Sequence, residues 1–79
     1  MNWRQHIVCD PNMLMGKPVV RGTRISAELI LGWFSSGWSV EQVLESYPNI
    51  TRDDILAVFS YAQELIHDNG ILPIDESAV

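Results

Sequence analysis

The chain has 79 residues, which is enough for one domain, and a net charge of −5 from ten acidic and five basic residues. Nucleic-acid binding depends on cations that meet phosphates, so this balance argues against a strong general DNA or RNA binder. Apolar residues make up 47% of the chain, while a domain this small buries only about 60–65% of the surface that its unfolded chain exposes. Apolar surface that cannot be hidden internally is usually hidden in a partner, so we expect an oligomer or a complex.

The charges are distributed unevenly along the chain. Four of the five basic residues precede residue 25, and the only acid in that stretch is Asp10. Nine acids follow, with the single base Arg52. A molecule that is basic at one end and acidic at the other suits docking onto a charged partner.

Cysteine content and hydropathy indicate a reducing, cytoplasmic location without membrane contact. Cys9 is the only cysteine, so we expect neither an internal disulfide nor a multi-cysteine zinc site. It lies in an apolar segment, where we expect it to be buried as a small hydrophobic residue. The first residues lack the apolar stretch of a signal peptide, and the apolar run at residues 29–34 is too short to span a bilayer.

The first 25 residues predict a short β arm. Residues 7–9 favour extended structure, residues 10–12 break it, residues 13–15 resume it, and residues 19–20 extend again. Pro18 cannot donate a ladder hydrogen bond, so these are edge or hairpin strands. A lone hairpin is marginal in water and needs a surface, or a second copy of itself, to pack against.

Three helices are predicted after the arm. Each begins at a residue whose side chain can cap the first amides: Ser26, Ser39 and Thr51. Gln42 and Asp54 stand three residues after the second and third caps, which is the spacing of a capping box. Gly37 can end the first helix in the left-handed conformation, and Pro48 stops the second.

Apolar residues recur on one side of each predicted helix. They are Leu29, Ile30, Trp33 and Phe34 in the first, Val40, Val43, Leu44 and Tyr47 in the second, and Ile55, Val58, Phe59, Ala62, Leu65 and Ile66 in the third. The sequence therefore predicts a mostly α fold, a three-helix, helix-turn-helix-like domain with a short N-terminal β arm. Residues 1–25 form the arm, 26–70 the three helices and 71–79 a C-terminal tail, all within one domain.

No residue pattern favours catalysis. Asp53 and Asp54 are neighbours on a helix and point about 100° apart, so they favour a role at the positive end of the helix dipole over convergence on one metal ion. His6 and His67 have no third ligand at a suggestive spacing. We expect no enzyme activity, no cofactor, no metal and no small-molecule substrate.

Partner-binding residues are expected at both ends of the chain. Trp3 lies outside every predicted element, and a large aromatic side chain can dominate a contact. The tail is apolar first and acidic later, which would fit a partner's groove. Its candidate contact residues are Ile71, Leu72, Ile74, Asp75 and Glu76. The alternative is that they fold back over the third helix.

The basic residues have two interpretations. Lys17, Arg21 and Arg24 either contact phosphate or a partner's acidic surface, or are surface charges, in which case Arg24 pairs with Glu28 four residues on. Arg52 stands at the start of the third helix, where a DNA-reading helix presents its contact residues. The carboxylates of the next two residues would repel phosphate, so this helix start is poorly suited to bind DNA.

The order of these motifs resembles a known bacterial family. Residues 16–25 (GKPVVRGTRI) resemble the signature of the family catalogued as domain of unknown function 433, as do the preceding Asp-Pro pair and the Tyr-Pro turn at residues 47–48. The resemblance covers about residues 6–66. It implies a helix-turn-helix-like fold and an antitoxin role, as the partner of a PIN-like ribonuclease toxin in a type II toxin–antitoxin module.

The function that we expect is stoichiometric inhibition of such a nuclease toxin by a homodimer that pairs through its β arm. The acidic half of the chain agrees with an inhibitor of a cationic RNA-binding cleft. The rival hypothesis is a DNA-binding transcriptional regulator of the helix-turn-helix class, including one that represses its own operon. That rival predicts salt-sensitive binding to a promoter, lost when Arg24 or Arg52 becomes alanine.

Overall fold

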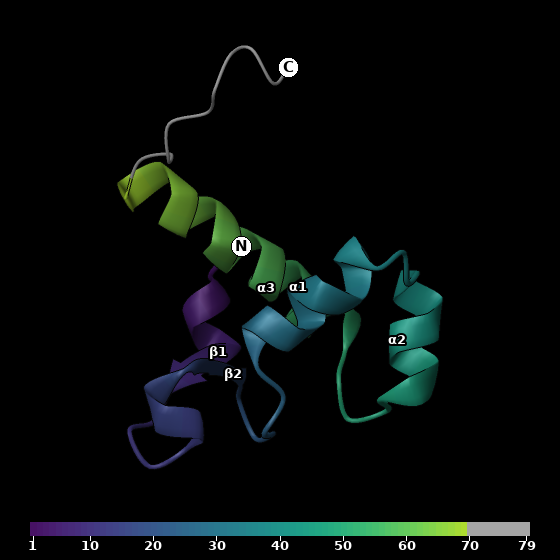
Figure 1. The fold of residues 1–79 in the computed structure, drawn as a ribbon, viewed down its shortest axis with the longest axis horizontal. Helices are drawn as coiled ribbons and strands as arrows, with labels where there is room; N and C mark the ends of the chain where they lie inside the picture. Colours follow the sequence, from purple (N-terminus) through teal and green to yellow (C-terminus); the bar gives the residue numbers. More distant parts are fainter. Residues whose placement is uncertain (70–79) are drawn as a thin grey trace.

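The computed structural model describes residues 1–69 and confirms the predicted fold class. A two-stranded hairpin, β1 (Ile7–Cys9) and β2 (Pro18–Val20), precedes three helices, α1 (Ala27–Ser35), α2 (Val40–Ser46) and α3 (Arg52–Asn69) (Figure 1). Two 3₁₀ helices, η1 (Trp3–Gln5) and η2 (Leu14–Gly16), flank β1. No helix within residues 1–69 is long and apolar enough to cross a membrane.

The helices begin where the capping residues predict. The Ser26 hydroxyl accepts a hydrogen bond from the Leu29 amide at 3.0 Å. At α2, Ser39 and Gln42 form a reciprocal capping box, and at α3 Thr51 and Asp54 do the same at 3.0 and 3.1 Å. These bonds satisfy amides that would otherwise lack partners in the first turn of each helix, so local sequence fixes where each helix starts.

The hairpin is antiparallel, with Ile7 opposite Val20 and Cys9 opposite Pro18. The prediction that residues 13–15 are extended is wrong, because Leu14 and Met15 belong to the 3₁₀ turn η2 and Met13 directly precedes it. The Asp10 side chain accepts the amide of Asn12, and its carbonyl accepts the amide of Met13, so the chain turns at once. The φ angles of Leu14 and Met15 are 49° and 59°, a left-handed conformation that bulky residues rarely adopt.

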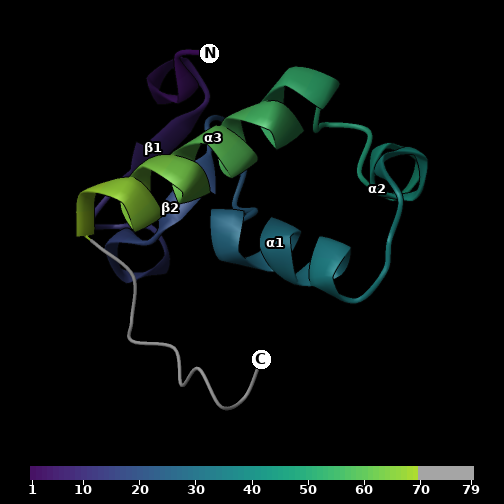
Figure 2. The same ribbon diagram turned by 90° about the horizontal axis from the view of Figure 1, so that it is seen from above.

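The hairpin and the helices share one core. Ile7 and Val20 of the hairpin belong to the same buried cluster as helical residues such as Ile30 and Val58. In the view from above, α3 runs across the hairpin and beside α1, with α2 at the far end (Figure 2). The surface that a lone hairpin needs is therefore supplied by α3 within the same chain.

Only some of the apolar residues predicted to lie on the buried side of each helix are buried. Those in the middle of this side are buried, and those at its margins are exposed. Ile30 and Val58 are fully buried, but Leu29, Phe59 and Ile66 are 48%, 42% and 57% exposed. Neighbouring helix positions are about 100° apart, and the few neighbouring elements of so small a domain cover only a narrow side of each helix. The apolar periodicity therefore marks a wider side than the fold buries.

Cys9 is exposed, which corrects the prediction that it is buried. It is the last residue of β1, and exposure rises along this strand from the buried Ile7 to Cys9. Strand β1 therefore leaves the core before it reaches the turn, and an apolar sequence neighbourhood does not ensure burial there.

The difference between Ile30 and its neighbour Leu29 can be measured. We expect Ile30→Ala to lower the free energy of unfolding by about 2–4 kcal/mol, because the deletion leaves a cavity at a fully buried site. The matched control Leu29→Ala should cost less than about 1 kcal/mol. Urea denaturation followed by circular dichroism measures both, and equal losses would contradict the burial described here.

Candidate interaction surface

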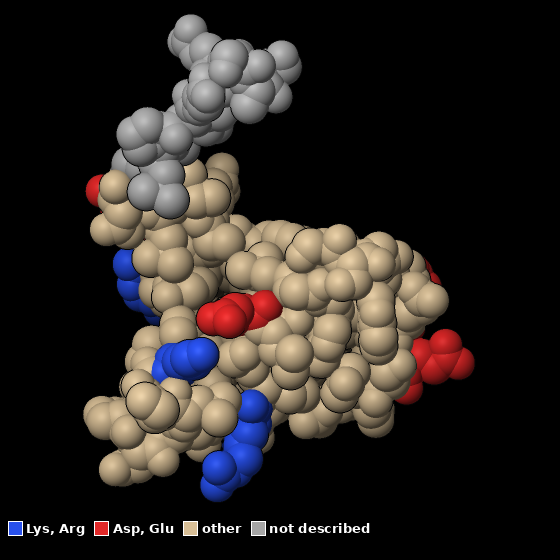
Figure 3. Space-filling view, viewed as in Figure 1, with Lys and Arg blue, Asp and Glu red and all other residues tan. Residues whose placement is uncertain are grey.

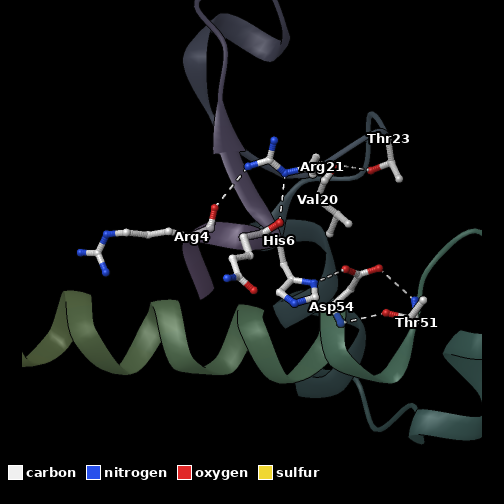
Figure 4. Close-up of polar contacts among 8 residues, drawn as sticks. Arg4, His6, Val20, Arg21, Thr23, Thr51 and Asp54 are labelled. Carbon is white, nitrogen blue, oxygen red and sulfur yellow. Dashed lines mark hydrogen bonds and ion pairs between the residues drawn. The ribbon is translucent and has the colours of Figure 1, made fainter. Parts of the chain in front are cut away.

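Arg21 fastens the hairpin to the N-terminal segment. Its Nε donates to the carbonyl of Gln5 at 3.0 Å and its Nη2 to the carbonyl of Arg4 at 3.4 Å, while its own amide donates to the carbonyl of His6 (Figure 4). These bonds use donors that a phosphate or a partner's acid would otherwise engage. The Arg21 side chain therefore has an intramolecular role in this structure.

His6 and Asp54 connect the same segment to the start of α3. The Nδ1 atom of His6 lies 2.9 Å from one carboxylate oxygen of Asp54, and the other oxygen accepts the amide of Thr51 at 3.0 Å (Figure 4). The Asp54 side chain is only 14% exposed and that of His6 26%. Asp54 thus caps a helix and anchors the arm. Within residues 1–69, no three His, Cys, Asp or Glu side chains are grouped so that they could hold a metal ion.

Trp3 lies in η1 and packs against α3. Its indole N–H donates to Glu64 at 2.9 Å, and its ring meets Tyr61 edge-on at 4.8 Å. Arg4 covers the other part of the indole and pairs with Glu64 at 3.1 Å. The prediction that Trp3 stands outside every element is therefore wrong, and a role in partner binding could use only its exposed part. These contacts span about sixty sequence positions, which local patterns do not reveal.

The remaining basic residues divide into paired and unpaired groups. Arg52 pairs with Glu41 of α2 at 3.1 Å. Lys17 lies 3.9 Å from Glu28, and within residues 1–69 no ion pair joins Arg24 to Glu28, so the structure does not show the pairing that one of the two interpretations expected. Arg24 precedes the cap residue Ser26, and the i, i+4 rule holds only when both residues are helical. Among residues 1–69, no acid and no hydrogen-bond acceptor is paired with the Arg24 side chain.

An open groove of about 570 Å³ lies between the hairpin loop and α1. Arg24 and Glu28 line it together with the apolar Leu14, Leu29 and Trp33. The Trp33 ring is held from behind, because it stacks on Tyr47 at 4.3 Å and on Trp38 at 5.8 Å. The sequence did not single out the loop residues Leu14 and Met15, although the turn signal at residues 10–12 precedes them.

Acidic side chains are exposed at the α2 end of the domain. In Figure 3 the basic side chains lie over the hairpin half, while acidic ones lie both at the opposite edge, where α2 is, and in the middle of the face beside the basic ones. That edge carries Glu41 and Glu45 of α2, both exposed. Hydrogen bonds from the backbone and from Arg52 hold the pKa of the Glu41 carboxyl below its usual value, so it is ionised at neutral pH.

The candidate tail contacts lie outside the described residues. They are Ile71, Leu72, Ile74, Asp75 and Glu76. Their role in partner binding stays a prediction.

The chain belongs to a family of proteins of unknown function, DUF433, whose model matches residues 7–62. This confirms the resemblance found in residues 16–25, and the structure assigns several of these residues to the fold. Val19 and Val20 are buried, Gly22 turns the chain at a φ of 79°, and the Thr23 hydroxyl donates to the Val20 carbonyl at 2.8 Å.

Two relatives are bacterial proteins. An uncharacterized protein of Sinorhizobium fredii, y4eO, is 35% identical over 60 residues, which is 76% of this chain but only 27% of that protein. A crystal structure of a DUF433 member from Anabaena variabilis is similar with a TM-score of 0.72 and 25% identity, covering 80% of this chain and 66% of that one. The matched part of the chain thus spans about a quarter of the length of the Sinorhizobium protein and about two thirds of the length of the Anabaena protein.

Burial raises the pKa of the Tyr61 hydroxyl above its ordinary value of 10.0, and the charge of the Cys9 thiolate adds to the rise. A raised folded-state pKa means that the contribution of Tyr61 to stability is fully present below pH 10 and is lost as the pH rises through the folded-state pKa. The free energy of unfolding of the unmodified chain should therefore fall more above pH 10 than that of the Tyr61→Phe variant, which has no hydroxyl to ionise at this position. Urea melts on either side of pH 10 measure this, with Tyr47→Phe as the control, and parallel losses would contradict it.

Proposed function

We propose that this chain is an antitoxin-type protein that binds a PIN-like ribonuclease toxin and blocks the approach of RNA to its active site. The proposal places both proteins in the bacterial cytoplasm. The observation that carries it is a set of three exposed acids, Glu41 and Glu45 of α2 and Asp53 at the start of α3, here called the acidic corner. An RNA-binding cleft is cationic because it must hold phosphates, and this corner presents carboxylates of the opposite sign.

Three features of the acidic corner support this role. All three carboxylates are exposed. The ion pair of Arg52 with Glu41 at 3.1 Å joins α2 to the start of α3, the helix that carries Asp53. Arg52 neutralises only one of the three, which leaves a net negative surface for docking.

The same corner weakens the rival hypothesis of a DNA-binding regulator. A helix-turn-helix protein presents the first residues of its recognition helix to base edges and phosphates. Here Arg52 is engaged by Glu41, and the exposed carboxylate of Asp53 follows it. Binding of Arg52 to a phosphate would require Glu41 to be displaced, and the phosphate would repel the carboxylate of Asp53. Both effects lower the affinity for DNA.

The test is an inhibition assay with a nuclease identified by its association with the chain. The tagged full chain is purified from its bacterial host, the associated proteins are separated under denaturing conditions and refolded, and ribonuclease activity is measured on a fluorescent RNA. We expect one small protein to cleave the RNA and to be inhibited when the chain is added at equal molarity.

Charge reversal then locates the contact. The double variant Glu45→Lys with Asp53→Lys should weaken inhibition by about tenfold or more, which corresponds to about 1.4 kcal/mol. The control Asp68→Lys, an exposed acid near the far end of α3, should inhibit as the unmodified chain does. The proposal fails if no ribonuclease associates with the chain, or if the chain instead shifts a fragment of its own promoter.

A further inference from the structure

The groove between the hairpin loop and α1 exposes apolar side chains to solvent. Leu14 and Leu29 on its walls are 42% and 48% exposed, and the neighbouring Met15 is 94% exposed. Leu14 and Met15 both adopt left-handed backbone angles, which cost free energy for bulky residues. The loop therefore holds two apolar side chains in solvent with a strained backbone, a combination that is common at sites of ligand contact.

Two cations, Arg24 and Lys17, stand at the edge of the groove against one carboxylate, Glu28, which also lines it, so the net charge there favours an anionic ligand. Arg24 lines the groove and, within residues 1–69, has neither an ion pair nor a side-chain hydrogen bond. Lys17 stands nearby, and its only acid partner in this range, Glu28, is 3.9 Å away with a side chain that is 82% exposed. A carboxylate brought to this edge would meet one unpaired guanidinium and one weakly paired ammonium group.

A segment with the matching chemistry occurs in the same sequence. Residues 71–76 read ILPIDE, with three large apolar side chains followed by two carboxylates. Apolar groups would cover Leu14, Leu29 and Met15, and the carboxylates would meet Arg24 and Lys17.

We propose that this groove binds residues 71–76 of a second copy of the chain, so that two copies associate by reciprocal exchange of these segments. A two-fold arrangement uses each groove and each segment once, and therefore closes at a dimer. This association does not require a nuclease partner. Its charged contacts are the basic residues Arg24 and Lys17, not the acidic corner.

The test is the self-association of the full chain, measured by sedimentation velocity over a range of concentrations. The unmodified chain should form a dimer. Arg24→Glu and Leu29→Asp, both at exposed positions, should weaken dimerisation by about tenfold or more. Leu56→Asp, a change at an equally exposed apolar residue of α3, is the control and should leave the dimer unchanged.

A charge exchange distinguishes direct contact from an indirect effect. Combining Arg24→Glu with Asp75→Arg and Glu76→Arg should restore dimerisation, because the attraction is re-formed with reversed signs. Circular dichroism verifies that each variant is folded. A chain that stays monomeric, a dimer insensitive to Arg24→Glu and Leu29→Asp, or a dimer that the charge exchange does not restore would each overturn the proposal.

Discussion

A few hydrogen bonds and an apolar contact hold the N-terminal residues, up to His6, against α3. These interactions determine the position of the hairpin. His6 meets Asp54 at 2.9 Å, and Arg21 bonds two carbonyls of the segment that carries His6. Beneath them Ile7 and Val20 enter the common core. A two-stranded hairpin has little stability alone, so this attachment decides where the strained loop of residues 10–17 stands relative to α1, and hence whether the groove exists.

The same bonds explain why the basic residues differ in role although they look alike in sequence. Arg4, Arg21 and Arg52 are engaged within the domain, by Glu64, by backbone carbonyls and by Glu41. Arg24 is left at the groove, and the acidic corner retains its net charge at the other end. Within residues 1–69, the two proposed contacts, with a nuclease and with a second copy, therefore use different residues.

Local signals in the sequence predicted the parts of the fold that depend on local interactions. The caps at Ser26, Ser39 and Thr51 and the strand at residues 7–9 all rest on groups a few positions apart. What could not be predicted depends on distant parts of the chain: the bond from Trp3 to Glu64, and the limited area of α1 that neighbouring elements cover, which leaves Leu29 exposed. The pairing of Arg24 with Glu28 failed for a local reason, because Arg24 lies before the cap of α1 and outside the helix.

The attachment of the N-terminal segment to α3 is tested most directly by a double-mutant cycle on His6→Ala and Asp54→Ala, because the cycle removes the separate cost of the lost cap at α3. We predict a coupling free energy of about 1 kcal/mol or more. Hydrogen exchange at the amides of Val20 and Arg21 should become faster in both single variants, since the hairpin would open more often. Additive effects on unfolding, with unchanged exchange in the hairpin, would contradict the account.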